Sequence, residues 1–150
     1  MNIINKDILT VEKGIVLQCS NTIGVVGGLA KAIATKYPQV YNRYKQDLAL
    51  GANLGDGSVC QITEDLFFIS MLTQSEIGTY KVQTNFEALE SCLKNVKLCS
   101  DIYNLPVWIP YYLGSGLGGG FTQQTKQETW AKVSQLIMSI IAEATICKLG

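Results

Sequence analysis

Residues 19–31, from Cys19 to Lys31, read CSNTIGVVGGLAK. A short apolar run precedes this segment and a stretch with helical periodicity follows it, so its glycines lie between a predicted strand and a predicted helix. A second glycine-bearing segment, Gly114 to Gly120, occupies the same kind of position near the end of the chain. Such alternation is expected when helices cover both faces of a largely parallel sheet. The sequence therefore predicts an α/β fold of three layers, α/β/α, with a central mixed, mostly parallel sheet.

The remaining elements follow from the same patterns. The expected strands are Asn2 to Asn5, Ile15 to Cys19, Ser58 to Ile62, Leu66 to Leu72, Val107 to Tyr111 and Thr145 to Leu149. The first helix is expected over Gly28 to Lys36 and ends at Tyr37-Pro38, because the residue before a proline avoids helical geometry. The pattern allows a continuation over Val40 to Gln46. Two apolar stripes at helical spacing indicate further helices: Val82, Phe86, Leu89, Leu93 and Val96, then Trp130, Val133, Ile137 and Ile141.

Size and composition are those of one ordinary globular domain. The chain has 150 residues, of which 47% are hydrophobic and 16% charged, and a chain of that length buries roughly two thirds of the surface that it exposes when unfolded. No repeat or linker interrupts it. We therefore expect a single domain over residues 1–150.

The charge balance and the missing histidine exclude several functions. Twelve basic and twelve acidic residues cancel, so no net positive field attracts nucleic-acid backbones, and we expect no general nucleic-acid binding. The chain has no histidine, which removes the usual neutral-pH base, every Ser-His or Cys-His nucleophile and the commonest zinc ligand. We expect neither a metal nor a cofactor.

The five cysteines are far apart and form no Cys-x-x-Cys pair, which indicates reduced thiols of a cytosolic protein. The chain starts with the strand-like Asn2 to Asn5 rather than with the basic and apolar regions of a signal peptide. The apolar stretch Ile137 to Ala144 is too short to span a bilayer. The expected location is the cytoplasm, without membrane contact.

The two glycine-bearing segments are suited to an anionic group. Glycine lets backbone N–H groups approach an anion closely, and a helix that begins just beyond adds partial positive charge. Two such loops on opposite sides of a cleft could hold a diphosphate without lysine, arginine or metal, although the glycines could also simply form tight turns. Gly114, Gly116 and Gly119 also fit Gly-x-Gly-x-x-Gly, but a Rossmann unit needs a later strand that ends in an acidic residue, and too little chain remains for one.

Taken together, these motifs resemble the macrodomain family over nearly the whole chain. The resemblance rests on an opening strand followed by Lys6-Asp7-Ile8, on Cys19 to Lys31 leading into a helix that ends at Tyr37-Pro38, and on Ile109-Pro110 leading to Gly114 to Gly120 before a last helix. Within the family the sequence is similar to the branch of ADP-ribose 1''-phosphatases and ADP-ribosyl-glutamate hydrolases. The resemblance implies binding of ADP-ribose or a close derivative.

The family resemblance also implies roles for individual residues. Asp7 would accept a hydrogen bond from the adenine amino group, and the Ile8 N–H would meet a ring nitrogen. Asn21 would hold hydroxyls of the distal ribose and, in an enzyme, would be the catalytic residue that positions the scissile group. The diphosphate would be lined by Gly27, Gly28, Ser115, Gly116, Leu117 and Gly118. Asp7 could instead cap the next segment, and Phe121 could pack against a ribose or cover the edge of the core.

The sequence departs from the family at the positions that carry hydrolase chemistry. The first loop is one residue shorter than the common Met-Gly-x-Gly-Ile-Ala pattern. The catalytic lysine of the glutamate hydrolases corresponds to Thr73 or Gln74, and their loop aspartate corresponds to Gly118. Neither threonine nor glutamine can form a covalent sugar adduct as an amine does. Lys81, a few residues further on, is more naturally a solvated lysine at the start of a helix.

Three functions remain open from the sequence. The first is an enzyme that hydrolyses ADP-ribose 1''-phosphate to ADP-ribose, for which no general base can be named. The second is a non-catalytic module that reads or sequesters ADP-ribose or a signal derived from NAD. The third is an interaction domain with vestigial loops, which would need neither Asp7 nor Asn21.

Overall fold

The computed structural model describes residues 2–78, 81–115, 119–120 and 122–149. Within these residues, six strands form one sheet in the order β1-β6-β5-β2-β4-β3. The strands are β1 (Asn2–Asn5), β2 (Gly14–Asn21), β3 (Gly57–Thr63), β4 (Leu66–Gln74), β5 (Val107–Pro110) and β6 (Thr145–Lys148). All neighbouring pairs are parallel except β3 and β4, which are antiparallel. The expected mixed, mostly parallel sheet is confirmed.

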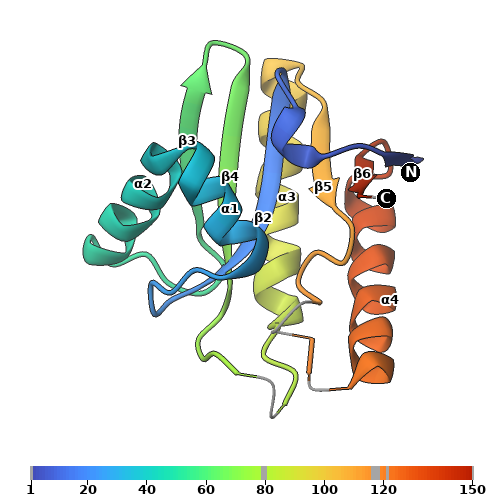
Figure 1. Cartoon of the computed structure of the whole chain (residues 1–150). Coiled ribbons are helices and arrows are strands. Elements are labelled where there is room, and N and C mark those ends of the chain that lie inside the picture. The colour runs from blue at the N-terminus through green and yellow to red at the C-terminus, as the bar shows by residue number, and fades with distance from the viewer. Residues whose placement is uncertain (1, 79–80, 116–118, 121, 150) are drawn as a thin grey trace.

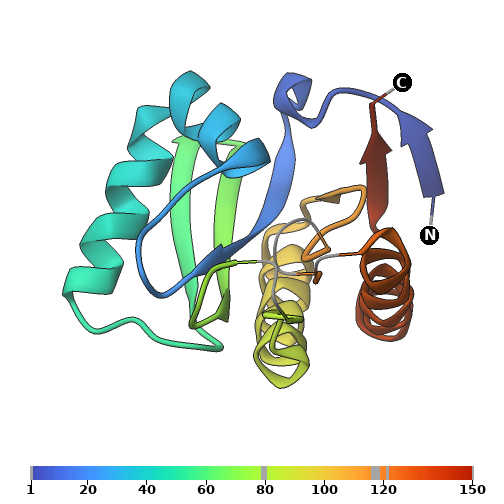
Figure 2. The same cartoon turned by 60° about the horizontal axis from the view of Figure 1, so that its bottom comes forward.

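Helices cover both faces of this sheet, as Figures 1 and 2 show. On one side lie α1 (Gly28–Lys36) and α2 (Pro38–Ala49), together with the short 3-10 helix η1 (Ile8–Thr10). The other side carries α3 (Phe86–Tyr103) and α4 (Gln123–Ile140). Among the described residues, no helix is both long enough and apolar enough to cross a membrane.

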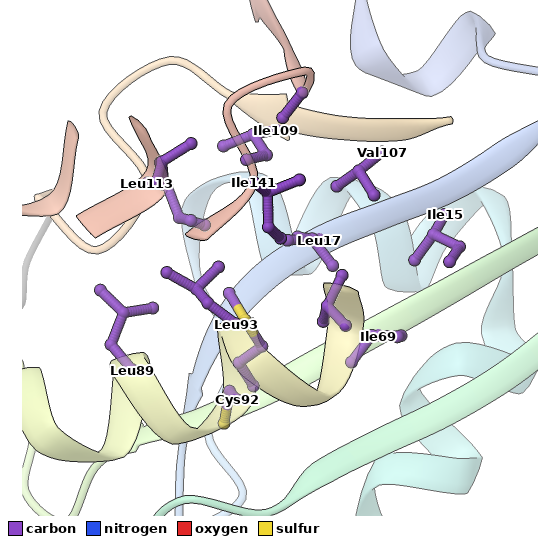
Figure 3. Close-up of a cluster of buried hydrophobic side chains, with 14 of the residues drawn as sticks. Ile15, Leu17, Ile69, Leu89, Cys92, Leu93, Val107, Ile109, Leu113 and Ile141 are labelled. Atoms are coloured by element: carbon purple, nitrogen blue, oxygen red, sulfur yellow. The ribbon is translucent and has the colours of Figure 1, made fainter. Parts of the chain in front are cut away.

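The larger part of the core lies between the sheet and the α3–α4 layer (Figure 3). Leu17, Ile69 and Ile109 project from three neighbouring strands, and Leu89 and Leu93 of α3 pack against them. Leu17, Leu89, Leu93 and Ile109 are fully buried. Because a well-packed interior resists displacement of its parts, this core fixes the strands from which the loops of the next section emerge.

Two helix boundaries differ from the sequence-based expectation. Pro38 does not merely stop α1: it occupies the first turn of a separate helix, α2, where its missing N–H costs nothing. The apolar stripe predicts that the next helix includes Val82, and this prediction is wrong. That helix, α3, starts at Phe86 because the Asn85 side chain caps it by accepting from the Ala88 N–H. Val82 is exposed and lies outside α3.

Candidate functional site

The candidate site lies at the carboxyl ends of two neighbouring strands, β2 and β5, whose following loops lead to opposite faces of the sheet. β2 and β5 are parallel neighbours, yet the loop after β2 leads to α1 on one face and the loop after β5 leads to α4 on the other. Figure 2 brings this edge of the sheet forward. In open α/β sheets, ligands bind in the crevice at the carboxyl ends of two such strands.

A cavity of about 470 Å³ lies at this crevice, within the usual range for ligand sites. We call it the loop cavity. The lining comes from β2 and the loop that follows it, from the start of α1, from the end of β4 and the segment after it, and from β5 and the residues that follow it. Its lining consists of Gln18, Cys19, Ser20, Asn21, Val25, Val26, Gly27, Gly28, Leu29, Ala30, Gln74, Ile77, Pro110, Tyr111, Tyr112, Leu113 and Gly114.

A second cavity of about 460 Å³ adjoins the first, and we call it the Asp7 cavity. It is lined by Lys6, Asp7, Ile8, Leu9, Gly28, Leu29, Ala32, Pro110, Tyr111, Cys147, Lys148 and Leu149. Gly28, Leu29, Pro110 and Tyr111 line both cavities. The two cavities therefore lie side by side, with these residues between them.

Asn21, at the end of β2, organises the first loop. Its Oδ1 accepts hydrogen bonds from the backbone N–H groups of Ile23 (3.1 Å), Gly24 (2.8 Å) and Val25 (3.2 Å). Its Nδ2 donates to the Val25 carbonyl oxygen at 2.9 Å. Because these contacts occupy the amide oxygen, the second N–H of Nδ2 is the part of the side chain left for a ligand.

Tyr44 of α2 ties this loop to the helical layer. Its hydroxyl lies 2.5 Å from the Asn21 carbonyl oxygen and 3.0 Å from Asn21 Oδ1. Tyr44 is buried, and burial raises the pKa of its phenol to about 12 although its hydrogen bonds act in the opposite direction. Tyr44 therefore stays neutral and keeps donating through the physiological pH range.

Asp7 caps η1, which is the capping role that the sequence analysis gave as the alternative to adenine binding. Its Oδ1 accepts from the Leu9 N–H at 2.9 Å. This bond uses one of the two carboxylate oxygens, and the residue lines the Asp7 cavity together with Ile8. The Ile8 N–H opens η1, and the first amides of a helix have no acceptor within that helix.

The glycines of the first loop and those of the second loop have different surroundings. A Cβ built at Gly27 or at Gly28 meets nothing within 4 Å. At Gly119, by contrast, a Cβ would lie 2.7 Å from the Ser115 carbonyl oxygen, and at Gly120 it would overlap Thr125 Cγ2. Close packing of the chain therefore accounts for Gly119 and Gly120, whereas the space beside Gly27 and Gly28 is open.

The second loop is described in part. Ser115 is fully buried, its N–H donates to the Tyr112 carbonyl oxygen, and its Oγ donates to the Leu113 carbonyl oxygen at 3.3 Å. The neighbouring Gly114 lines the loop cavity, as Asn21 does. The other expected ligand contacts, Gly116, Leu117, Gly118 and Phe121, lie outside the described residues.

The sequence analysis did not single out the tyrosines that follow β5. Tyr111 lines both cavities, and its ring stacks on that of Tyr112 with centroids 4.7 Å apart. Trp130 of α4 packs against both rings, and the Lys148 ammonium lies 4.6 Å from the Tyr111 ring centroid. Tyr112 has a φ of 64°, which a bulky residue rarely adopts. That backbone strain is the feature that marks this turn as unusual.

The chemical groups within the loop cavity are mostly neutral. None of its described lining residues carries a carboxylate, ammonium or guanidinium group. Burial raises the pKa of the Cys19 thiol to about 12, so this sulfur is not a thiolate nucleophile at neutral pH. Gln74 lines the cavity and Thr73 is fully buried. Neither side chain can act as an amine nucleophile.

The chain matches solved structures over nearly its whole length. A crystal structure of a protein from Bacteroides thetaiotaomicron is 21% identical, with a TM-score of 0.85 and 99% of each chain covered. A macrodomain protein from Streptomyces coelicolor is 19% identical, with a TM-score of 0.77, 99% of this chain and 98% of that chain covered. DarTG of Thermosipho africanus, solved in complex with ADP-ribose, is 17% identical, with a TM-score of 0.75 over 99% of this chain and 41% of its own.

No protein-family model matches the sequence, and no curated protein matches it significantly. The similarity to these structures therefore lies in the common arrangement of strands and helices. This chain has the macrodomain fold.

Proposed function

We propose that the chain binds ADP-ribose, or a close derivative of it, along the cleft formed by the loop cavity and the Asp7 cavity. The adenine lies in the Asp7 cavity, and the diphosphate and distal ribose lie in the loop cavity. The observation that carries this proposal is the sharing of Gly28, Leu29, Pro110 and Tyr111 by the two cavities. A ligand with a base at one end and a sugar at the other needs such an elongated site.

At the adenine end, the carboxylate of Asp7 has two tasks that do not compete. Oδ1 holds the Leu9 N–H, while Oδ2 accepts from the adenine amino group. The Ile8 N–H donates to a ring nitrogen of the same base. A carboxylate only accepts and an amide N–H only donates, so this pair recognises a donor beside an acceptor, as adenine presents them.

At the other end, backbone amides bind the diphosphate. Gly27 and Gly28 leave open space at the start of α1, where unpaired N–H groups and the helix dipole favour an anion. Gly114 lines the same cavity. Lys6 and Lys148, which line the Asp7 cavity, add positive charge to a cleft whose loop cavity has no charged side chain among its described lining residues.

The side chains that line the loop cavity favour binding of ADP-ribose without hydrolysis. Asn21 Oδ1 is occupied by the loop that it organises, so Asn21 positions the loop rather than activating water. The lining of the loop cavity offers no carboxylate base among the described residues. Hydrolysis of ADP-ribose 1''-phosphate is the alternative, and it would have to proceed by water positioned on backbone donors alone.

Calorimetric titration with ADP-ribose tests the proposal. We expect saturable one-to-one binding, and no measurable heat at millimolar ligand would refute it. Asp7→Asn is the sharpest variant because the amide oxygen still caps Leu9, whereas Nδ2 cannot accept from the adenine amino group. We expect about tenfold weaker binding of ADP-ribose and little change for ribose 5-phosphate. Asp65→Ala, in the exposed turn between β3 and β4, is the control.

Phosphate release from ADP-ribose 1''-phosphate separates the two forms of the function. A pure binding module releases no phosphate above the uncatalysed rate while it still competes for ADP-ribose. Turnover that disappears together with ADP-ribose binding in Asp7→Asn would establish the phosphatase instead.

A further inference from the structure

Gln18 is a buried polar residue in the wall of the loop cavity. Its residue exposure is 6%, and it lies near the middle of β2, where the neighbouring side chains are mostly apolar. Its Nε2 donates to Ser70 Oγ of β4 at 2.9 Å. Its Oε1 is buried without a hydrogen-bond partner among the described residues.

The strand alternation explains which side of the cleft Gln18 occupies. Successive side chains of a strand point to opposite faces, so Gln18 shares its face with Val16. Val16 packs in the cluster that contains Ile33 of α1. Gln18 therefore belongs to the α1 side of the sheet, and both it and Leu29 of α1 line the loop cavity.

An orphaned buried oxygen is costly because it has lost its water and gained nothing in return. Thr73 Oγ1 and Gln83 Nε2 are the other buried orphans in the described part of the chain, but neither residue lines either cavity. Of these three residues, Gln18 is the one that lines a cavity.

We propose that Gln18 accepts a hydrogen bond from a ribose hydroxyl of the bound ligand and so selects for a sugar at this wall of the cleft. This inference rests on the proposed binding of ADP-ribose. A phosphate oxygen is excluded as the partner of Oε1 because both atoms are acceptors. A hydroxyl can donate, so it satisfies Oε1 while Nε2 keeps its hydrogen bond to Ser70 Oγ.

The double variant Gln18→Met/Ser70→Ala tests this role. Removing both members of the Gln18–Ser70 hydrogen bond leaves no new orphan behind, and such paired replacements are often nearly neutral for stability. We expect ADP-ribose to bind about tenfold more weakly, as the loss of one buried hydrogen bond implies. The thermal midpoint of the ligand-free protein should be unchanged or higher. Gln61→Met, at an exposed position of β3, is the matched control and should bind like wild type.

The outcomes separate this inference from the function on which it rests. If the wild type and the double variant bind ADP-ribose equally well, Gln18 does not contact the ligand, although the proposed function stands. If the wild type binds no ADP-ribose, both ideas fall. A crystal structure of the wild-type complex gives a readout that does not depend on the variant folding. It should place a ribose oxygen about 3 Å from the Gln18 amide, and an amide that faces only water or phosphate would overturn the inference.

Discussion

Replacing Asn21 by alanine should lower the stability of the protein, because the side chain holds the loop after β2 in place. The side chain makes five hydrogen bonds, with the N–H groups of Ile23, Gly24 and Val25, with the Val25 carbonyl oxygen and with the Tyr44 hydroxyl. Each hydrogen bond contributes about 1 kcal/mol net. Because several donors share one oxygen, we count about three full hydrogen bonds rather than five. The expected loss in the free energy of unfolding is therefore about 3 kcal/mol.

Urea denaturation followed by circular dichroism measures this loss directly. Asn21→Asp is an informative second variant because it keeps the acceptor for the three backbone N–H groups and loses the donor to the Val25 carbonyl oxygen. It should cost less than the alanine variant. Asn42→Ala, at an exposed position of α2, should change stability by less than about 0.5 kcal/mol.

The reasoning would be refuted if Asn21→Ala cost no more than Asn42→Ala while abolishing ADP-ribose binding. That combination would mean that the side chain acts on the ligand and that the loop holds its shape without it. In the expected case, stability and affinity fall together. Asn21→Asp then recovers part of the stability but not the affinity, because it lacks the Nδ2 N–H that is left for a ligand.

Three further expectations follow from the structure. Gly119→Ala should lower the unfolding midpoint in a thermal melt, because a Cβ there would lie 2.7 Å from the Ser115 carbonyl oxygen; an unchanged midpoint would contradict that packing. Gly27→Ala should fold with a loss below about 1 kcal/mol, since nothing lies within 4 Å of the new Cβ, yet it should weaken ADP-ribose binding in calorimetry; unchanged affinity would remove Gly27 from the diphosphate site. Above pH 9, urea midpoints should fall as the pH rises towards 12, because the pKa values of Cys19 and Tyr44 are both raised to about 12 in the folded protein. The folded state then holds protons that the unfolded state releases, and Tyr44→Phe should reduce this decline.

The sequence predicted the fold well because local signals agreed with the tertiary structure. Helix α1 has the expected bounds, Gly28 to Lys36, since glycines precede it and Pro38 follows it. The strands lie where short apolar runs lie between turn residues. Val82 shows the limit of periodicity: it fits the apolar stripe of α3, but the cap at Asn85 starts the helix four residues later.

Parts of the candidate site could not be predicted in this way. The sequence located the two loops, and Asn21 of the first loop and Gly114 of the second both line the loop cavity. Gln18 gave no signal, because one polar residue within an apolar strand looks the same whether it faces a neighbouring strand or a cavity. The role of Tyr111 depends on the path of the chain after β5, which brings its ring between two cavities.

A crystal structure of the protein with ADP-ribose tests the central claim most directly. The ligand should span the cleft, with its adenine amino group at the free oxygen of Asp7 and its diphosphate beside Gly27 and Gly28. A ligand bound elsewhere, or bound in the cleft with its adenine beside Asn21 instead, would contradict the proposed site.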